Sequence, residues 1–440
     1  MVRRIVLLAW MLLFMMLGAA AESTTGQKVY VVKSTGVTAL VNEAGESILE
    51  DESIDEIFTV RPDCLYAVGT RGDYALYDAA GNPRGAVRFA MIGDAGDALI
   101  FRQGDLYGVM SASGDVLLPA EWSQLVSNGE GGFLGLSDGT AYHIDNQMTA
   151  TPLEVSIADG LTAFHDGRMV FIDENGGYGC MDPAGKVAIA PDLDWIDAFR
   201  DGIAIAAVGG GYGVIDSSGT WIVDPQYRWM RRGESFVAGL DGEGNLRAFS
   251  NQGDLLFEVF AHTTQAAIVG DYVAIWDTGT ARLYNAKGRC IYEAPADTLF
   301  FPGADGQVIA SAGQWDAPSQ WLVDPSGIAG EGRYQRVMPL QSGRYAFLTM
   351  QGVEYYSELL DSLQISWNYD SARWGLMDGN GVALLPAEYL EIRLLGTDRL
   401  LLRGESTVIF ADTDGKPLRV WRLTPTRTNS EAAAQTPASN

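Results

Sequence analysis

The feature that most constrains the fold of this 440-residue chain is a unit of about 34 residues that recurs from end to end. Each copy centres on a turn glycine, and the aromatic, apolar and proline positions around it keep their places. The turn positions are Gly45, Gly81, Gly114, Asn146 in a degenerate copy, Gly185, Gly219, Gly253, Gly288, Gly327, Gly381 and Gly415. A fixed period of this length is typical of a propeller, a solenoid or another repeat array.

The stretch before each turn predicts a strand that is covered on both faces. In Tyr212-Gly-Val-Ile215, aromatic and β-branched residues occupy odd and even positions alike. The glycine after the aromatic residue weakens a strand, and it is tolerated where a ring or another backbone approaches closely. We therefore expect a ring from a neighbouring unit to lie over this glycine in the four clearest copies, Gly108, Gly179, Gly213 and Gly375.

The turns read Asp-x-x-Gly, as in Asp216-Ser-Ser-Gly219. Asp at the first position accepts hydrogen bonds from the turn amides, and Gly at the fourth adopts a positive φ. The pattern therefore predicts a type I turn closed by a glycine bulge. Calcium binding is the alternative for Asp378-Gly-Asn-Gly381 and Asp412-Thr-Asp-Gly415. Both lack the Glu that completes an EF-hand loop, so no metal site is predicted.

A second apolar run follows each turn and reaches a proline, as in Thr220-Trp-Ile-Val-Asp-Pro225. Proline has no N–H for a strand ladder, so we expect the strand to stop there. An aromatic residue follows within four positions, as Tyr227 does, and is placed to fill the gap between units. A third short apolar run, such as Gly202–Val208, completes the period. Each unit is therefore predicted to hold about three short antiparallel strands.

The combined pattern, Tyr/Trp-Gly-x-Ile/Met-Asp-x-x-Gly followed by a proline, resembles the WG repeat, a β-rich repeat of bacterial proteins. The same four glycines match the glycine of that repeat, and Trp374-Gly375 is the one strict Trp-Gly pair. The resemblance covers most of residues 28–424. It implies an all-β repeat fold and an interaction role, and it brings no catalytic residues.

About eleven β units can form two shapes. A closed β-propeller hides its sheet edges and suits aromatic residues at unit junctions, although propellers commonly have four to eight blades. An open β-solenoid or superhelical stack accepts any number of units but needs capped ends. We predict a propeller-like repeat domain over residues 27–424, with the open stack as the alternative.

Two irregular places interrupt the period. The copy near Asn146 is degenerate, and an insertion near residues 350–372 separates Gly327 from Gly381. The apolar spacing of the insertion predicts a short helix or a long lid loop. Either place could mark a boundary between two packed sub-bodies.

The chain begins with the three parts of a signal peptide. Arg3-Arg4 precedes an apolar run over Ile5–Leu17, and Ala19–Ala21 offers a small-residue cleavage site. We predict a signal peptide over residues 1–21, with an uncleaved membrane anchor as the alternative. No Cys follows the run to carry a lipid. The protein is therefore expected to be secreted or extracytoplasmic, with no membrane span in its mature chain.

Composition narrows the class of partner. Asp and Glu total 56 against 30 Lys and Arg, a net charge of −26, and a nucleic-acid partner is not expected because it requires a basic surface. The three cysteines, Cys64, Cys180 and Cys290, are too few and too far apart for a disulfide scaffold. They are expected to be buried free thiols, with one long-range disulfide as the alternative. Residues 425–440, rich in Thr, Ser, Pro and Ala, predict a disordered tail.

No set of catalytic, cofactor-binding or metal-binding residues stands out. His143, His165 and His262 are the only histidines and never share ligand spacing. Asp216–Trp221 misses the Asp-box spacing of sialidases by one residue, and the likeness to quinone-cofactor propellers is partial. We predict a binding or scaffold module for a protein or cell-wall glycan partner. The alternative is a carbohydrate-active or cofactor-binding propeller enzyme with a carboxylate-lined central pocket. Any site is expected where the repeat is broken.

Overall fold

The computed structural model describes residues 28–34, 36–61, 65–260, 263, 265–313, 318–357 and 362–423. The predicted signal peptide and tail, Cys64 and His262 lie outside these residues. The described chain consists of strands and their connections, and none of it is helical. It accordingly contains no helix that could cross a membrane.

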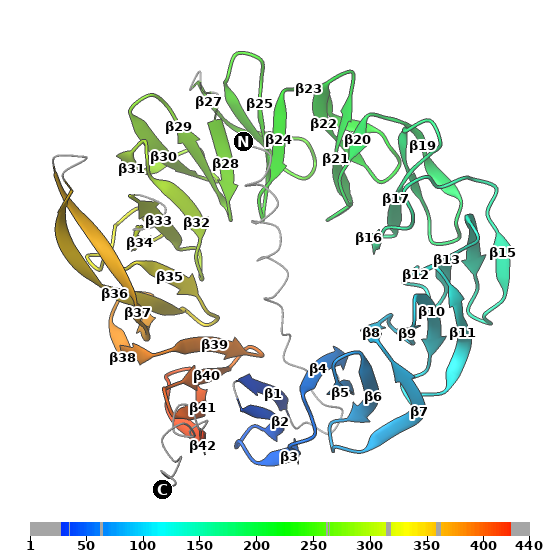
Figure 1. Ribbon diagram of the computed structural model, residues 1–440. Helices are drawn as coiled ribbons and strands as arrows, with labels where there is room; N and C mark the ends of the chain where they lie inside the picture. The colour runs from blue at the N-terminus through cyan, green and yellow to red at the C-terminus, as the bar shows by residue number, and fades with distance from the viewer. Residues whose placement is uncertain are drawn as a thin grey trace, which may run out of the picture.

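Eleven antiparallel sheets form one ring around a central opening (Figure 1). Each sheet is a blade built from consecutive strands, and we number the blades one to eleven along the chain. The prediction of an all-β, propeller-like array is confirmed, and its eleven units require no regrouping.

The strands of the first five blades are as follows. Blade one holds β1 (Val29–Ser34), β2 (Val37–Asn42) and β3 (Ser47–Glu50); blade two holds β4 (Glu56–Arg61), β5 (Leu65–Thr70), β6 (Asp73–Asp78) and β7 (Pro83–Phe89); blade three holds β8 (Met91–Asp94), β9 (Leu99–Gln103), β10 (Leu106–Met110) and β11 (Val116–Trp122); blade four holds β12 (Gln124–Ser127), β13 (Phe133–Ser137), β14 (Thr140–Ile144) and β15 (Ala150–Pro152); blade five holds β16 (Phe164–His165), β17 (Arg168–Ile172), β18 (Tyr178–Met181) and β19 (Val187–Leu193).

The remaining six blades complete the ring. Blade six holds β20 (Trp195–Ile196), β21 (Ile203–Val208), β22 (Gly211–Asp216) and β23 (Trp221–Tyr227); blade seven holds β24 (Trp229–Arg232), β25 (Val237–Leu240), β26 (Leu246–Phe249) and β27 (Leu255–Val259); blade eight holds β28 (Gln265–Val269), β29 (Tyr272–Trp276), β30 (Thr280–Asn285) and β31 (Cys290–Pro295); blade nine holds β32 (Leu299–Pro302), β33 (Val308–Ala312) and β34 (Ser319–Val323); blade ten holds β35 (Arg336–Pro339), β36 (Arg344–Ser357), β37 (Ser362–Asp378) and β38 (Ala383–Tyr389); blade eleven holds β39 (Glu391–Leu395), β40 (Arg399–Arg403), β41 (Thr407–Asp412) and β42 (Pro417–Arg422).

Nine of the eleven blades have four strands, one more than the sequence predicted. The first strand of each of these blades lies nearest the ring axis and the fourth lies at the rim (Figure 1). The extra strand is the inner one, which is only two residues long in β16 and β20. Such short segments carry no periodic pattern, so the sequence does not reveal them.

The two three-stranded blades lack different strands. In complete blades the Asp-x-x-Gly turn joins the third and fourth strands, as Asp216–Gly219 joins β22 to β23. The equivalent turn in blade one joins β2 to β3, so the strand that is missing from the described part of blade one is the inner one. In blade nine the turn follows β34, and the outer strand is replaced by a loop that makes isolated bridges to β34.

The predicted turn geometry is confirmed. Asp216 Oδ1 accepts hydrogen bonds from the backbone N–H groups of Ser218 and Thr220 at 2.8 and 3.0 Å. Gly219 closes the turn with a φ of 87°. The Ser218 hydroxyl also donates to Asp216, and together these bonds hold the pKa of that carboxyl below its usual range. The carboxylates of Asp378 and Asp412 accept the same pair of turn amides.

The glycine prediction needs correction, because the nearby ring belongs to the same blade. A Cβ on Gly213 would lie 2.7 Å from Cζ3 of Trp221, which is on β23 of blade six, and 2.4 Å from the carbonyl oxygen of Val223. Gly375 likewise faces Phe347 of its own blade. The close approach comes from a bulge in the outer strand, where the register passes from Tyr212↔Tyr227 to Val214↔Val223.

The proline prediction is also wrong, because the strand continues through the proline. Pro225 lies within β23 (Trp221–Tyr227), among the residues that form the bulge over Gly213. A bulge and an outer edge are the places where a strand can accommodate a residue without an N–H.

The core lies between the faces of successive blades. One cluster joins Val214 and Val223 of blade six to Met230 and Phe249 of blade seven. Tyr227 packs edge-on against Phe249, with 5.7 Å between ring centroids, which confirms that this aromatic residue fills a junction between units. The aliphatic character of both strand faces follows from this sandwiching of each blade between two others.

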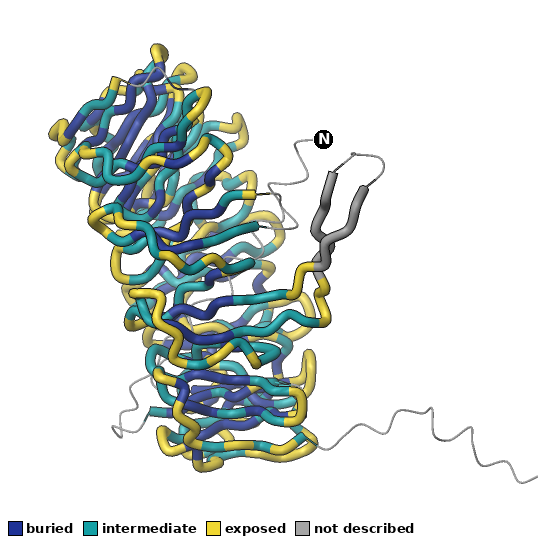
Figure 2. The backbone as a smooth tube through the Cα atoms, turned by 90° about the vertical axis from the view of Figure 1, so that its left-hand side faces the viewer, coloured by how far each residue is buried: buried dark blue, intermediate teal, exposed yellow. Residues whose placement is uncertain are grey.

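The insertion forms a β-hairpin rather than the expected helix or lid loop. β36 and β37 remain paired from Arg344↔Asp378 to Ser357↔Ser362, with one irregularity near Gln351. The hairpin rises from one face of the ring (Figure 2). Its tip, residues 358–361, lies outside the described chain.

Candidate functional site

One break in the repeat lies where blade eleven meets blade one. Because the described part of blade one has no inner strand, β1 presents its edge toward the ring axis. A cavity of about 980 Å³ opens here, and we call it the seam cavity. It is lined by residues 33, 34 and 36–38 of blade one, by residues 50–52, 54 and 55 of the connection to blade two, and by residues of β39, β40 and β42 in blade eleven.

The ring closes at this seam without a strand shared between the first and last blades. An apolar cluster joins Tyr30 and Val32 of β1 to Leu401 and Phe410 of blade eleven, and the rings of Tyr30 and Phe410 lie 5.4 Å apart. Polar contacts reinforce the cluster at both sides. Lys28 pairs with Asp398 at 3.0 Å, and Arg419 pairs with Glu50 at 2.8 Å.

Burial and hydrogen bonding have opposite effects on the pKa of Asp398. Burial alone would raise the pKa of Asp398, but hydrogen bonds from Lys28 and Tyr30 outweigh it and hold that pKa below its usual range. Burial and the same contact with Asp398 raise the pKa of the Tyr30 hydroxyl. The carboxylate is therefore charged at neutral pH and fixes blade eleven to the first residues of β1.

The hydrogen-bond register shows which groups of β1 face the open edge. Asn42 directs its N–H toward β3, so every second residue of β2 counted from Asn42 faces β3. The residues of β2 between these face β1 and pair with Tyr30, Val32 and Ser34. The N–H and C=O groups of the intervening β1 residues, Val29, Val31 and Lys33, therefore point away from β2. In complete blades with a longer inner strand, such as blade two, the equivalent groups pair with that strand. In blade six the N–H of Ile205 donates instead to the Asp197 carboxylate.

One of these edge groups has a substitute partner. The guanidinium of Arg393, on β39 of blade eleven, donates to the carbonyl oxygen of Lys33. In other blades the corresponding carbonyl accepts the N–H of the residue that precedes the inner strand: Arg228 donates to Leu240 at 2.9 Å and Leu390 to Arg403 at 2.7 Å. A side chain thus occupies the position of a missing backbone donor.

The seam cavity also holds donors that lack acceptors among the described residues. Nε of Arg403 is buried without a hydrogen-bond partner, and so is the hydroxyl of Ser34. Nε of Arg393 makes only an ion-pair contact of 3.6 Å with Glu391. The cavity wall therefore offers hydrogen bonds to a ligand that brings carbonyl or carboxylate oxygens.

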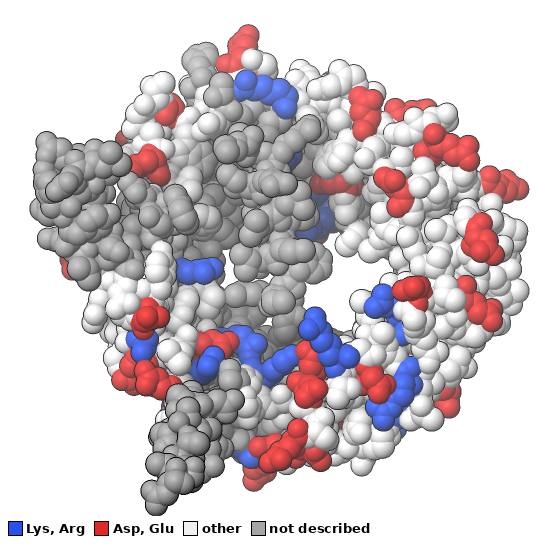
Figure 3. All heavy atoms as spheres, in the orientation of Figure 1, with Lys and Arg blue, Asp and Glu red and all other residues white. Residues whose placement is uncertain are grey.

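Charge is distributed unevenly between the axis and the rim. Figure 3 shows Lys and Arg gathered around the central opening, with Asp and Glu mostly toward the rim. The described strands nearest the axis carry Lys33, Arg61, Arg231, Arg232, Arg336 and Arg393 against Glu56, Asp94 and Glu391. This basic excess does not favour the carboxylate-lined central pocket of the alternative enzyme hypothesis.

Two smaller cavities lie at the other irregular blades. A cavity of about 400 Å³ has blade nine on one side and blade ten on the other. Its walls are Leu322 together with the loop that replaces the outer strand of blade nine, and the turn Gly379–Gly381 of blade ten. Another, of about 650 Å³, lies between β15 of blade four and the turn of blade five, and His143 is on its wall. All three cavities thus lie where the repeat departs from its pattern.

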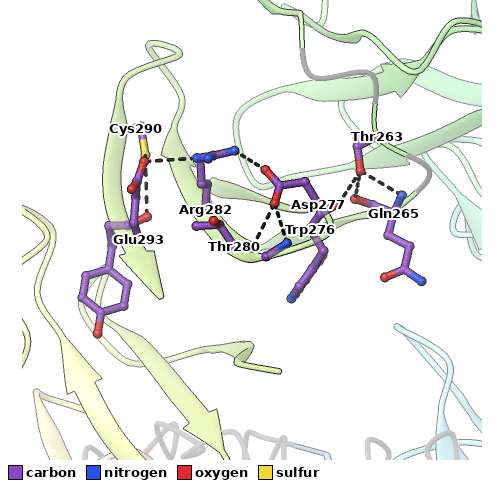
Figure 4. Close-up of polar contacts among 10 residues, drawn as sticks. Thr263, Gln265, Trp276, Asp277, Thr280, Arg282, Cys290 and Glu293 are labelled. Atoms are coloured by element: carbon purple, nitrogen blue, oxygen red, sulfur yellow. Dashed lines mark hydrogen bonds and ion pairs between the residues drawn. The ribbon is translucent and has the colours of Figure 1, made fainter. Parts of the chain in front are cut away.

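A polar cluster on blade eight holds Cys290 but offers no reactive group. Arg282 lies between Asp277 and Glu293, and Asp277 also accepts the N–H of Gly279 and of Thr280 (Figure 4). Burial raises the pKa of the Cys290 thiol, so it is protonated at neutral pH and weakly nucleophilic. The contacts are those of a turn and a cross-strand ion pair.

The described residues contain no group of three or more His, Cys, Asp and Glu side chains arranged to hold a metal ion. His165 ends the two-residue strand β16, and its side chain is exposed. The sequence pattern carried no signal for the seam, because the two sets of residues that form it are more than 330 positions apart in the chain.

Comparison with known proteins identifies the repeat. The family described as the WG containing repeat matches residues 178–212 and 212–232, in blades five to seven, so the chain is a WG repeat-containing protein. No curated protein matches the chain significantly.

Several solved structures show distant similarity. A eukaryotic initiation factor is 12% identical, with a TM-score of 0.39, and covers 70% of this chain and 96% of its own. BamB from Moraxella catarrhalis is 15% identical, with a TM-score of 0.27, and covers 70% and 94%. AztD from Citrobacter koseri is 11% identical, with a TM-score of 0.29, and covers 69% and 94%. Similarity at this level carries no information on function.

Proposed function

We propose that this WG repeat-containing protein is an exported scaffold that binds a protein or cell-envelope partner. The predicted signal peptide supports export, and the ring supplies a rigid frame. The partner is held on one face of that frame, which we call the hairpin face.

The hairpin face is defined by the connections between second and third strands. In blade ten this connection is the extended β36–β37 hairpin, and in blade one it is the short link from Ser34 to Val37, which borders the seam cavity. Arg373 at the base of the hairpin pairs with Glu405 of blade eleven at 2.9 Å. The hairpin, blade eleven and the seam cavity thus form one continuous surface. This continuity is the observation that carries the proposal.

Exposure at the base of the hairpin supports contact with a partner. Tyr369 is 65% exposed, and tyrosine is one of the residue types that contribute most to binding where a partner covers them. The outer rim provides a matched position, since Leu255 on β27 is 54% exposed.

Site-specific photo-crosslinking tests the proposal. A benzophenone amino acid replaces Tyr369 in one variant and Leu255 in the other, and each is irradiated with isolated cell-wall glycan or with solubilised envelope proteins. We expect a discrete adduct from position 369 and none from position 255. Equal adducts from both positions, or none from position 369 with either probe, would show that the hairpin face does not bind such a partner.

A further inference from the structure

We propose that the seam cavity accepts an extended segment of a partner protein as the inner strand of blade one. The inference rests on the proposed binding function and specifies where the partner is held and in what form. The ligand adds a strand to β1, so that blade one gains the four strands that most other blades already have.

The backbone of β1 supplies the first part of the recognition. Val29, Val31 and Lys33 direct their N–H and C=O groups toward the open edge. An extended peptide that runs antiparallel to β1 can form hydrogen bonds with these groups through the N–H and C=O groups of every second peptide residue. Val29 is buried and Val31 is half-buried, so an unpaired N–H or C=O here is costly. Arg393 already satisfies the carbonyl of Lys33 and would be displaced or shared.

The flanking blades show which side chains suit an inner strand. Both neighbouring inner strands begin Glu-Ile, as Glu56-Ile57 in β4 and Glu391-Ile392 in β39. Ile57 and Ile392 are 3% and 2% exposed, so this second position packs between blades. A carboxylate at the first position of the ligand would lie opposite Lys33, near the unsatisfied donor of Arg403. The fitting ligand is therefore an extended segment with an acidic residue followed by an aliphatic one.

The described chain itself does not turn into the vacant position. After five other blades the residue that follows the outer strand donates its N–H to the next blade, as Arg228 does, whereas Leu153 after blade four donates to Ala141 of its own blade. Leu423, the last described residue, instead donates to the carbonyl of Ser406 in its own blade eleven at 2.9 Å. The chain is therefore still paired with blade eleven at this point, which favours an occupant from another molecule.

The direct test measures binding of a synthetic peptide with the sequence of residues 54–61, Ile-Asp-Glu-Ile-Phe-Thr-Val-Arg, to the purified full chain by fluorescence anisotropy. If the peptide pairs with β1 as β4 pairs with β5, the N–H groups of the peptide residues equivalent to Glu56 and Phe58 face β1. The N–H of the residue equivalent to Ile57 then faces the ring axis. N-methylation at the Phe58 position should weaken binding about tenfold or more, and N-methylation at Ile57 should change it by less than about threefold. No binding, or equal losses from the two methylations, would overturn the inference.

Hydrogen exchange on the full chain identifies the occupant. We expect the amides of Val29, Val31 and Lys33 to exchange rapidly in the free protein and to become protected when the peptide binds. Protection in a monomer without peptide would mean that a segment of the same chain fills the position, and protection in a dimer, sized by light scattering, would mean that a second copy does. Either result would overturn the assignment to a partner protein.

A substitution on the protein separates this inference from the proposed function. Val31→Pro removes one N–H from the open edge and leaves the β1–β2 ladder intact, so it should abolish peptide binding with little change in Tm. Ile205→Pro, the equivalent change in blade six, removes an N–H that donates to the Asp197 carboxylate just after β20 at 2.6 Å, so it should lower Tm clearly. If Val31→Pro lowers Tm as much as Ile205→Pro, the edge is already paired and the inference fails. Crosslinking from position 369 that persists without peptide binding would leave the proposed function standing.

Discussion

The close contact at Gly213 leads to a quantitative prediction about stability. Replacing Gly213 with Ala places a Cβ 2.4 Å from the carbonyl oxygen of Val223 and 2.9 Å from the backbone carbon of Asp224. These are backbone atoms and cannot rotate away, so the bulge must shift. Overpacking of this kind costs about 1–3 kcal/mol, and the backbone contacts place the expected loss near the upper end, at about 2.5 kcal/mol.

The expected change in melting temperature follows from the size of the ring. Unfolding entropy is about 2.1 cal/mol/K per residue, so residues 28–423 contribute about 0.8 kcal/mol/K if the ring unfolds cooperatively. A loss of about 2.5 kcal/mol then lowers Tm by about 3 °C, which differential scanning calorimetry resolves.

The matched control is Gly242→Ala. Gly242 has no heavy atom within 4 Å of an added Cβ, and its φ lies outside the left-handed region. The substitution should leave stability unchanged or raise it by about 0.5 kcal/mol, because alanine restricts the unfolded chain. If both variants melt at the same temperature, the close approach is not what requires glycine at position 213.

Two further predictions concern titratable groups. The folded-state pKa values of Asp216 and Asp324 are lowered, chiefly by the hydroxyl hydrogen bonds of Ser218 and Ser326. The two carboxylates therefore contribute stability above the unfolded pKa of about 3.9, and this contribution is lost as pH falls through the lower folded pKa. Thermal melts between pH 7 and pH 3 should therefore show a shallower loss of Tm in Asp216→Asn than in the parent, and an identical slope would contradict this. Burial raises the pKa of the Cys180 thiol to about 12, so iodoacetamide at pH 8 should alkylate it only after denaturation; peptide mass spectrometry showing rapid labelling in the folded protein would be the contrary result.

The sequence revealed most of what is local in this fold. The Asp-x-x-Gly turn depends on contacts within five residues, and the bonds of Asp216 to Ser218 and Thr220 were predicted in kind. The aromatic residue at the junction between units, Tyr227, was recognised because each period repeats the same role. Repetition turns a long-range arrangement into a local pattern, which is why the propeller could be predicted.

The remaining features depend on pairing between distant or irregular segments. The ring near Gly213 was assigned to a neighbouring unit because periodicity does not distinguish a contact within a blade from one between blades. The apolar spacing of the insertion predicted a short helix or a long lid loop, whereas the pairing that is observed along β36 depends on the partner strand β37. The seam required contacts between β1 and β39, whose residues give no sign of adjacency in sequence.

The closure of the ring by side chains alone affects how such a chain can change in evolution. Every blade consists of consecutive strands, and the first and last are joined by contacts such as Tyr30–Phe410 and Arg419–Glu50 rather than by a common strand. Duplication or loss of one 34-residue unit in the gene therefore breaks no element that straddles the two ends. Recombination between copies can therefore change the number of blades. Selection then acts on the contacts between the first and last blades, which must still close the ring.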